Sequence, residues 1–459
     1  MLIRIEVANY KSFRDAQTFS MEAGSGKETP GNVIRTPRID VLKSAAIYGH
    51  NASGKSNLLD VLYALGSVII ESARGDIPKR VPRMEPFRLD PALKDMPSRF
   101  EIHLLIGSNE YRYQLHATAE RIIHEALHHR APGKHAKWVR LLDRPDPASD
   151  DKVHVSSQFA GAAAQRDAIV TTTVPERSMV GAAAALNEKH ARRVFDWFDK
   201  QLFFYKLHRD FRREEHLLDE LADRLDGDAT FKDVFLPLIA DADFGVVDVK
   251  VVPQTTRQLE LFEQATKVVR ELMEKLAPDS ELNIEPPLTG GLRLTHRNLV
   301  DDVDSDLSFK SESSGTRRFM ALVYALMRHT KNDDLPGTVV IDELDSSLSS
   351  DLVERFLLLT HSAKYNPSGT QVVFSTHDRS LMDVPSLLRR DQIWVAEKRP
   401  DGGTELFSMA DFGSQIKPNT PKSRQFAAGS YGGVPEFGPL LEDVPREPDP
   451  YTLPLFSER

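Results

Sequence analysis

The segment Gly49-His50-Asn51-Ala52-Ser53-Gly54-Lys55-Ser56 matches the pattern G-x-x-x-x-G-K-[ST]. An apolar run at 41–49 that reads as a strand precedes it, and 57–70 has apolar residues at helical spacing. Glycines in this context let backbone N–H groups turn inward on phosphate oxygens. We predict a P-loop in which Lys55 reaches the β and γ phosphates, Ser56 coordinates Mg²⁺, and Asn57 adjoins the nucleotide. An unused glycine-rich turn is the alternative, which the flanking elements disfavour.

Two later apolar segments read as short strands that end in polar residues. The first, 338–345, ends in Asp342 and Glu343. We expect Asp342 in the Mg²⁺ shell and Glu343 beside the attacking water. A solvated acidic pair is the alternative. The second, 371–378, ends in His377, which we expect on the γ-phosphate, although a lone histidine at a strand end is usually structural.

The composition indicates an ordinary globular chain of two or three domains, with 459 residues, 40% apolar and 28% charged. A net charge of -9 disfavours sequence-blind adhesion to nucleic acid. The chain has no cysteine, which excludes disulfides and thiolate zinc sites. Charges near the first residue and the short apolar run at 61–70 predict a cytoplasmic protein with no membrane partner.

The pattern along the chain predicts four regions. Alternation at 2–8 indicates a strand, and 101–115 indicates a hairpin, so 1–124 reads as one lobe of an α/β head. Residues 125–290 are Ala-rich and charged, with helical spacing, and predict a mostly helical insertion. The head returns at 291–412, and 413–459 forms a Gly/Pro-rich acidic tail that we expect to wrap the surface or be partly disordered.

Residues 124–128, His-Glu-Ala-Leu-His, match the zinc-protease motif H-E-x-x-H. The extended form of the motif fails, because Pro132 and Lys134 stand where Gly and His are required. The preceding segment reads as a strand and not as a helix. We therefore expect no zinc site here.

The order of motifs resembles ABC-type heads of the SMC and RecF group, and more closely the AAA-type ATPases of bacterial abortive-infection and anti-phage systems. The matching pieces are VANYKSF (7–13), GHNASGKSNLL (49–59), SESSGTRR (311–318), VVIDELDSSL (339–348), FSTHD (374–378) and YGGVPEF (431–437). The resemblance implies an α/β P-loop NTPase of ABC-ATPase head type with a mostly helical insertion, and ATP with Mg²⁺ as ligands.

On this resemblance Ser313, Ser314 and Gly315 match the signature loop, which contacts the γ-phosphate bound to the other subunit of a dimer. A polar turn before an amphipathic helix is itself a ready anion site, although a plain helix cap is the alternative. Residues 346–349 match the D-loop, with Ser349 in place of its usual acid, and 86–90 stands at the Q-loop position without a glutamine.

The resemblance implies an ATP-hydrolysing, ATP-dependent homodimer that acts as a sensor or regulator in anti-phage defence. Its effector, a nuclease in such systems, is expected in trans, because the 82 residues after His377 (459 − 377), which include the Pro-rich tail, are too few for a further folded nuclease domain. A higher oligomer and a nucleic-acid partner stay open. The alternatives are a DNA-repair head that clamps DNA and a regulator that binds ATP with little hydrolysis.

Overall fold

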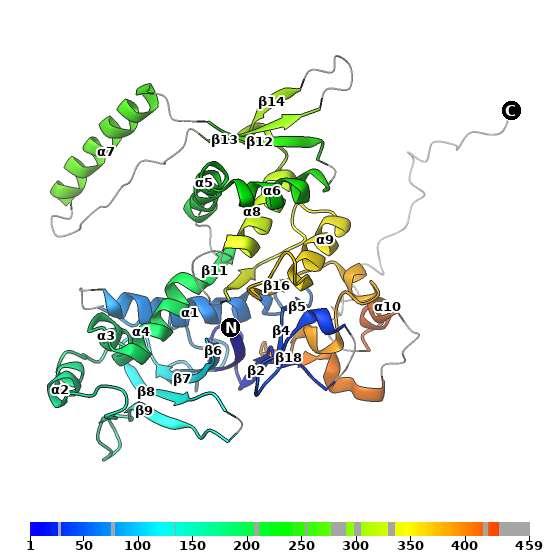
Figure 1. The fold of residues 1–459 in the computed structure, drawn as a ribbon. Coiled ribbons are helices and arrows are strands. Elements are labelled where there is room, and N and C mark those ends of the chain that lie inside the picture. Colours follow the sequence, from blue (N-terminus) through cyan, green and yellow to red (C-terminus); the bar gives the residue numbers. More distant parts are fainter. Residues whose placement is uncertain are drawn as a thin grey trace, which may run out of the picture.

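Two sheets of the protein enclose one central helix (Figure 1). The computed structural model describes residues 1–25, 29–74, 79–133, 135–205, 211–242, 244–252, 256–276, 291–297, 304–328, 336–415 and 421–430. Strands and helices alternate through most of this length, so the α/β class predicted from the sequence is confirmed. The YGGVPEF segment and most of the predicted tail lie outside the described residues.

The first sheet is antiparallel and has seven strands in the order β10-β9-β8-β7-β6-β1-β2. Its strands are β1 (Leu2–Ala8), β2 (Gln17–Ser20), β6 (Ser98–Ile106), β7 (Asn109–Ala117), β8 (Ile122–Arg130), β9 (Val139–Arg144) and β10 (His154–Val155). The predicted strand at 2–8 and the predicted hairpin are both present, with Ile106 opposite Asn109 across a two-residue turn. Along β7 buried and half-buried residues alternate, as in a sheet with one face against the core.

The second sheet has six strands in the order β11-β15-β16-β5-β17-β18. These are β5 (Ser44–Tyr48), β11 (Leu202–Tyr205), β15 (Thr338–Ile341), β16 (Gln371–Ser375), β17 (Ile393–Lys398) and β18 (Thr404–Ser408). All neighbours run parallel except β17 and β18. Every residue of β5, β15 and β16 is buried, as expected for a parallel sheet covered on both faces.

Helix α1 (Lys55–Ala73) lies between the two sheets and covers the prediction of a helix at 57–70. Its buried apolar residues share one core with β1, β6 and β7 on one side and with Val373 of β16 on the other. Among the described residues α1 alone has the length and hydropathy to cross a membrane, but 61% of that window is buried inside the protein. Core packing between two sheets therefore accounts for its apolar character.

The opposite face of the parallel sheet carries a second core, built on α8 (Ser314–Met327) and α9 (Ser350–His361). Helices α5 (Phe211–Gly227) and α6 (Ala229–Ala240) and the small sheet of β12 (Val246–Val252), β13 (Gly291–His296) and β14 (Ser305–Ser308) are stacked above them (Figure 1). Apolar residues of both helices and of β12 and β13 belong to the same core as α8. Helix α8 therefore lies between the parallel sheet and the layer formed by α5, α6 and β12.

The remaining elements are short or peripheral. The helices are α2 (Ala163–Thr171), α3 (Met179–Ala185), α4 (Lys189–Asp196), the π-helix η2 (Trp197–Gln201), α7 (Thr256–Leu276) and α10 (Lys422–Ala427). One two-stranded sheet joins β3 (Val33–Ile34) to β4 (Val41–Leu42). The 3₁₀ helices are η1 (Pro30–Asn32), η3 (Phe309–Ser311), η5 (Arg379–Met382), η6 (Arg390–Gln392) and η7 (Met409–Gln415).

The helical prediction for 125–290 is wrong in three places. Residues 122–130, 139–144 and 154–155 form β8, β9 and β10 of the antiparallel sheet, because pairing of β8 with β7, β9 with β8 and β10 with β9 satisfies their backbone. Residues 202–205, Leu-Phe-Phe-Tyr, form an edge strand of the parallel sheet beside β15. The sheet of β12, β13 and β14 takes strands from both sides of residue 290. Strand β8 also crosses residue 124, and the division of the chain into domains stays a prediction.

Candidate functional site

Three predicted motifs meet at one edge of the parallel sheet. Strands β15, β16 and β5 are adjacent and parallel, with Ile341 opposite Phe374 and Ser375 opposite Ile47. The P-loop follows β5, the acidic pair follows β15, and His377 follows β16. The carboxyl ends of neighbouring parallel strands form the usual ligand-binding edge of an open α/β sheet.

The backbone of the P-loop takes conformations that favour glycine. Gly49 has φ 148° and Gly54 has φ 108°, and Ala52 between them is left-handed at 63°. A Cβ on Gly54 would lie 2.3 Å from Thr404 Oγ1, and one on Gly49 would lie 2.4 Å from the carbonyl oxygen of Ala396. Helix α1 begins directly after Gly54, so its N-terminal amides adjoin the loop.

Two residues that the sequence reasoning did not select hold the P-loop in place. Thr404 Oγ1 donates to the carbonyl oxygen of Ser53 at 2.7 Å and lies 2.8 Å from Ser12 Oγ. Asn57 donates its amide to the same Ser12 hydroxyl at 2.7 Å. Asn57 thus supports the loop from below, and its contact with a nucleotide stays a prediction. Ser12 lies within the quoted motif VANYKSF, whereas nothing local marked Thr404.

Lys55 is 6% exposed and lies beneath the P-loop. Its ammonium donates to the carbonyl oxygens of Gly49 at 2.9 Å and His50 at 3.0 Å. Burial lowers the pKa of Lys55, and the nearby negative charges of Asp342 and Glu343 act in the opposite direction. The structure therefore brings the P-loop lysine and the acidic pair together.

The acidic pair is fixed by hydrogen bonds to neighbouring elements. Ser375 Oγ donates to Asp342 Oδ1 at 2.5 Å and accepts from the backbone N–H of Glu343 at 2.7 Å. Glu343 has φ 54°, a left-handed conformation that is uncommon for residues with a side chain. Its carbonyl oxygen accepts from the guanidinium of Arg318. The sequence reasoning missed the roles of Ser375 and Arg318, although both lie within quoted motifs.

His377 is exposed at the same edge. Its backbone N–H lies 3.3 and 3.2 Å from the two carboxylate oxygens of Asp345. The loop after β16 is thereby tied to the turn after β15. The placement agrees with the predicted site, and the role of the imidazole stays a prediction.

Ser313, Ser314 and Gly315 form the start of α8. Ser313 is its N-cap, because its hydroxyl accepts from the backbone N–H of Thr316 at 3.1 Å, and Ser313 and Ser314 are exposed. A Cβ on Gly315 would lie 2.8 Å from the carbonyl oxygen of Ser347. The helix-cap role weighed as the alternative is thus present, and contact of this loop with a nucleotide on another subunit stays a prediction.

The donors at this edge suit a nucleotide with Mg²⁺. Ser56 is exposed on the first turn of α1, and Asp342 is half-buried directly after β15. In the described part of the chain no three His, Cys, Asp or Glu residues form a metal-binding group. Mg²⁺ does not need such a group, since it commonly takes one or two protein oxygens and completes its shell with water and substrate phosphates.

The H-E-x-x-H segment at 124–128 has a structural role. It lies on strand β8, whereas the zinc motif requires a helix. Glu125 is fully buried and accepts from Tyr113 Oη at 3.0 Å, Ser178 Oγ at 2.5 Å and the backbone N–H of Met179 at 2.7 Å. This carboxylate therefore anchors the start of helix α3 to the antiparallel sheet.

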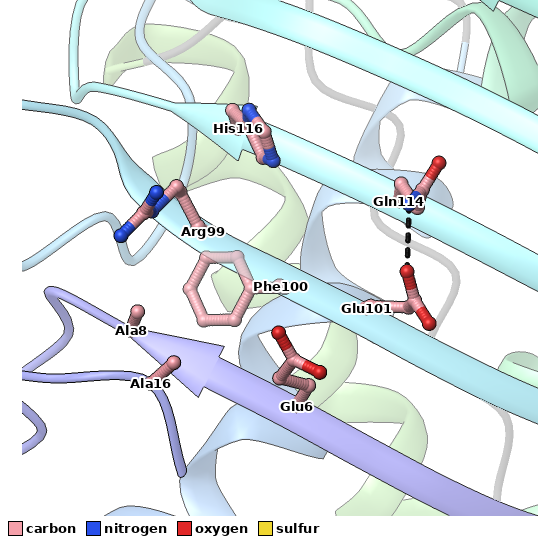
Figure 2. Close-up of a pocket in the computed structure, with 8 residues that line it drawn as sticks. All are labelled: Glu6, Ala8, Ala16, Arg99, Phe100, Glu101, Gln114 and His116. Atoms are coloured by element: carbon pink, nitrogen blue, oxygen red, sulfur yellow. Dashed lines mark hydrogen bonds between the residues drawn. The ribbon is translucent and has the colours of Figure 1, made fainter. Parts of the chain in front are cut away.

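A separate hollow of about 170 Å³ lies on the antiparallel sheet (Figure 2). Its polar lining consists of Glu6, Arg99, Glu101, Gln114 and His116, and Gln114 donates to Glu101 at 2.6 Å. None of the predicted site residues lines it. Both acidic and basic side chains line it, so its charge favours no single class of ligand.

Comparison with known proteins places most of the chain in one protein family. Residues 44–383 match the family described as "AAA domain, putative AbiEii toxin, Type IV TA system". No curated protein sequence matches the chain. Similar solved structures include the recombination mediator RecF with ATPrS, at 12% identity and TM-score 0.32, and RecF with ATP, at 13% and 0.28. The alignments cover 89% of this chain and 98% and 99% of those chains. Because the family match runs from β5 to beyond His377, over most of the chain, the protein belongs to this family of AAA-type ATPases.

Proposed function

We propose that the protein hydrolyses ATP as a homodimer and acts as a sensor or regulator in a bacterial anti-phage defence system. The observation that carries the ATPase proposal is that the P-loop, the acidic pair and His377 lie at one edge of the parallel sheet. The negative charges of Asp342 and Glu343 raise the pKa of Lys55 against the effect of burial. The family description, which names a toxin of toxin–antitoxin systems, supports the defence role.

The proposed roles follow from the chemistry of each side chain. Lys55 and the amides at the start of α1 bind the phosphates of ATP. Ser56 and Asp342 would hold Mg²⁺, which when bound neutralises charge on the phosphates. Glu343 accepts a proton from the attacking water, and His377 donates a hydrogen bond at the γ-phosphate. Left-handed backbone at Glu343 and glycines in the P-loop fit this assignment, since strained backbone gathers at active sites.

The dimer proposal rests on the start of α8. Ser313 and Ser314 are exposed at a helix N-terminus, a place that attracts anions. A Cβ on Gly315 would lie 2.8 Å from the carbonyl oxygen of Ser347, which belongs to the segment 346–349 that resembles the D-loop. We propose that this end of α8 completes the ATP site of the other subunit, while the P-loop and acidic pair form the rest.

The proposed biological setting follows from the description of the family. A cytoplasmic location, a nuclease effector in trans and recognition of that effector by the insertion are consistent with the family description. A DNA clamp of RecF type is the competing function. Turnover that rises when DNA is added to the isolated protein would favour the clamp, whereas turnover that responds only to a co-purified protein would favour the defence regulator.

The first test replaces Lys55 with alanine. Loss of its charge-assisted contacts should weaken ATP binding about tenfold to a hundredfold by calorimetry. Lys364→Ala, at an exposed lysine, is the matched control and should bind ATP as the parent does. If Lys55→Ala and the parent bind ATP equally, the P-loop assignment is wrong.

The second test concerns catalysis and assembly. Glu343→Gln should reduce turnover on the order of a hundredfold while ATP holds the dimer closed, as seen by light scattering.

Ser313→Arg should bind ATP without dimerising. Mixing Ser313→Arg with Lys55→Ala chains should restore part of the turnover, because one of the two sites then carries no substitution. No recovery, together with parental turnover by Ser313→Arg alone, would show a site that is complete in one chain.

A further inference from the structure

Arg318 is buried at the junction of three elements. Its side chain leaves the second turn of α8 and is only 2% exposed. The guanidinium lies 5.1 Å from the ring centre of Tyr205 on β11 and donates to the carbonyl oxygen of Glu343 after β15. A planar, always charged donor that is held by an aromatic face has little freedom to turn away from that carbonyl.

The residue that Arg318 contacts is held at both ends. The N–H of Glu343 donates to Ser375 Oγ at 2.7 Å, and its carbonyl oxygen accepts from Arg318. Between these two hydrogen bonds the backbone is left-handed, with φ 54°. Such a conformation persists in a residue with a side chain only where the surroundings impose it. Removal of one of the two hydrogen bonds therefore lets Glu343 relax, and its carboxylate moves with it.

Helix α8 is also fixed at its other end. Arg224 of α5 donates to the carbonyl oxygens of Met327 at 3.3 Å and Arg328 at 2.9 Å, and Arg328 pairs with Glu220 at 3.1 Å. Helix α8 thus joins residues 211–227 to the turn that carries the acidic pair. A shift of the helix along its axis would act directly on the carbonyl of Glu343.

We propose that Arg318 is a positioning residue for hydrolysis, which acts through the backbone of Glu343 and makes the signature helix the link between the rest of the head and the catalytic carboxylate. The proposal rests on the proposed ATPase function of Glu343. It adds a residue that binds neither ATP nor Mg²⁺, and it predicts that turnover and ATP binding separate when this residue is changed.

The test is Arg318→Met in the full chain, since methionine keeps apolar packing against Tyr205 but donates no hydrogen bond. Turnover should fall on the order of tenfold to a hundredfold, as for small misplacements of catalytic groups, with ATP affinity within about twofold of the parent. Arg318→Lys, which retains a donor, should recover part of the loss. Arg192→Met is the matched control, because Arg192 also stacks on an aromatic ring, that of Phe195 at 4.8 Å, and lies on α4, which carries no residue of the proposed site. It should turn over as the parent does.

The double variant Glu343→Gln/Arg318→Met separates positioning from an independent effect. Turnover no lower than that of Glu343→Gln alone would support the proposal, because Arg318 then acts only through Glu343. A further drop by the full factor seen in Arg318→Met would overturn it. Equal loss of ATP affinity, turnover and melting temperature in Arg318→Met would also overturn it, since that pattern reports a structural role. Parental turnover by Glu343→Gln would refute the proposed function itself, and the inference with it.

Discussion

Replacing Gly54 with alanine tests how far the P-loop depends on its packing. Gly54 has φ 108°, and a Cβ there would lie 2.3 Å from Thr404 Oγ1 and 2.8 Å from Ser12 Oγ. Those two hydroxyls also hold the loop from below, through Ser53 and Asn57. The substitution therefore strains the backbone and displaces the groups that support it.

The magnitude can be worked from these two effects. Left-handed backbone costs a residue with a Cβ about 1–2 kcal/mol, and overpacking in a tight site costs about 1–3 kcal/mol. Their sum is about 2–5 kcal/mol, which opposes the loop conformation that binds phosphate. At about 1.4 kcal/mol per factor of ten, ATP affinity should fall about thirtyfold or more.

Gly133→Ala separates the two effects. Gly133 has φ 126° and nothing within 4 Å of its Cβ position, so this control carries backbone strain alone. Calorimetric titration with ATP and urea unfolding should be measured on both variants and the parent. Gly133→Ala should bind ATP as the parent does. If Gly54→Ala binds ATP within about threefold of the parent, the argument that these hydroxyls define the loop is refuted.

Three other predictions concern Glu125, His361 and Ser375. Glu125→Ala leaves four hydrogen-bond donors without their acceptor and should lower the free energy of unfolding by about 3–5 kcal/mol in urea, with Glu125→Gln less affected. Burial, and to a smaller extent the charge of Lys43, lower the pKa of His361 in the folded protein to about 3. Between pH 6.5 and 3 the imidazole is therefore protonated in the unfolded chain but neutral in the folded protein. Stability should fall as the pH drops from about 6.5 toward 3, and His361→Gln should flatten that slope in pH-dependent melts. Ser375→Ala removes one hydrogen bond to each of Asp342 and Glu343 and should slow turnover about tenfold at unchanged ATP affinity; parental turnover would contradict this.

The local parts of the site were predictable from the sequence. The spacing of Gly49, Gly54 and Lys55 specifies a backbone that few other sequences adopt, and the apolar runs before them and before Asp342 specify buried strands. Because those strands turned out parallel and adjacent, motifs about 290 residues apart reached one edge. Only the family resemblance predicted that these motifs come together, because no local sequence pattern shows which strands pair.

The rest depends on contacts between distant segments. Strand β8 reads Ile-Ile-His-Glu-Ala-Leu-His-His-Arg, a composition that also suits a helix, and pairing with β7 and β9 decides the outcome. Thr404 reaches Ser53 across 351 positions, and Arg318 reaches Glu343 across 25. No sequence pattern around a single threonine or arginine predicts such a contact, so these two hydrogen bonds could be found only in the structure.

If residues 346–349 act as the proposed D-loop, the turn after β15 holds other groups that can link the loops around the acidic pair. Ser349, at the position of the usual D-loop acid, caps α9 by accepting from the N–H of Leu352 at 3.4 Å. The turn has its own acid in Asp345, which holds the N–H of His377, while Arg318 holds the carbonyl of Glu343. Hydrogen bonds thus connect the turn after β15 both to the loop after β16 and to helix α8. In the proposed dimer, movement of α8 would then reach the acidic pair through the backbone of one chain, without a carboxylate that crosses between subunits.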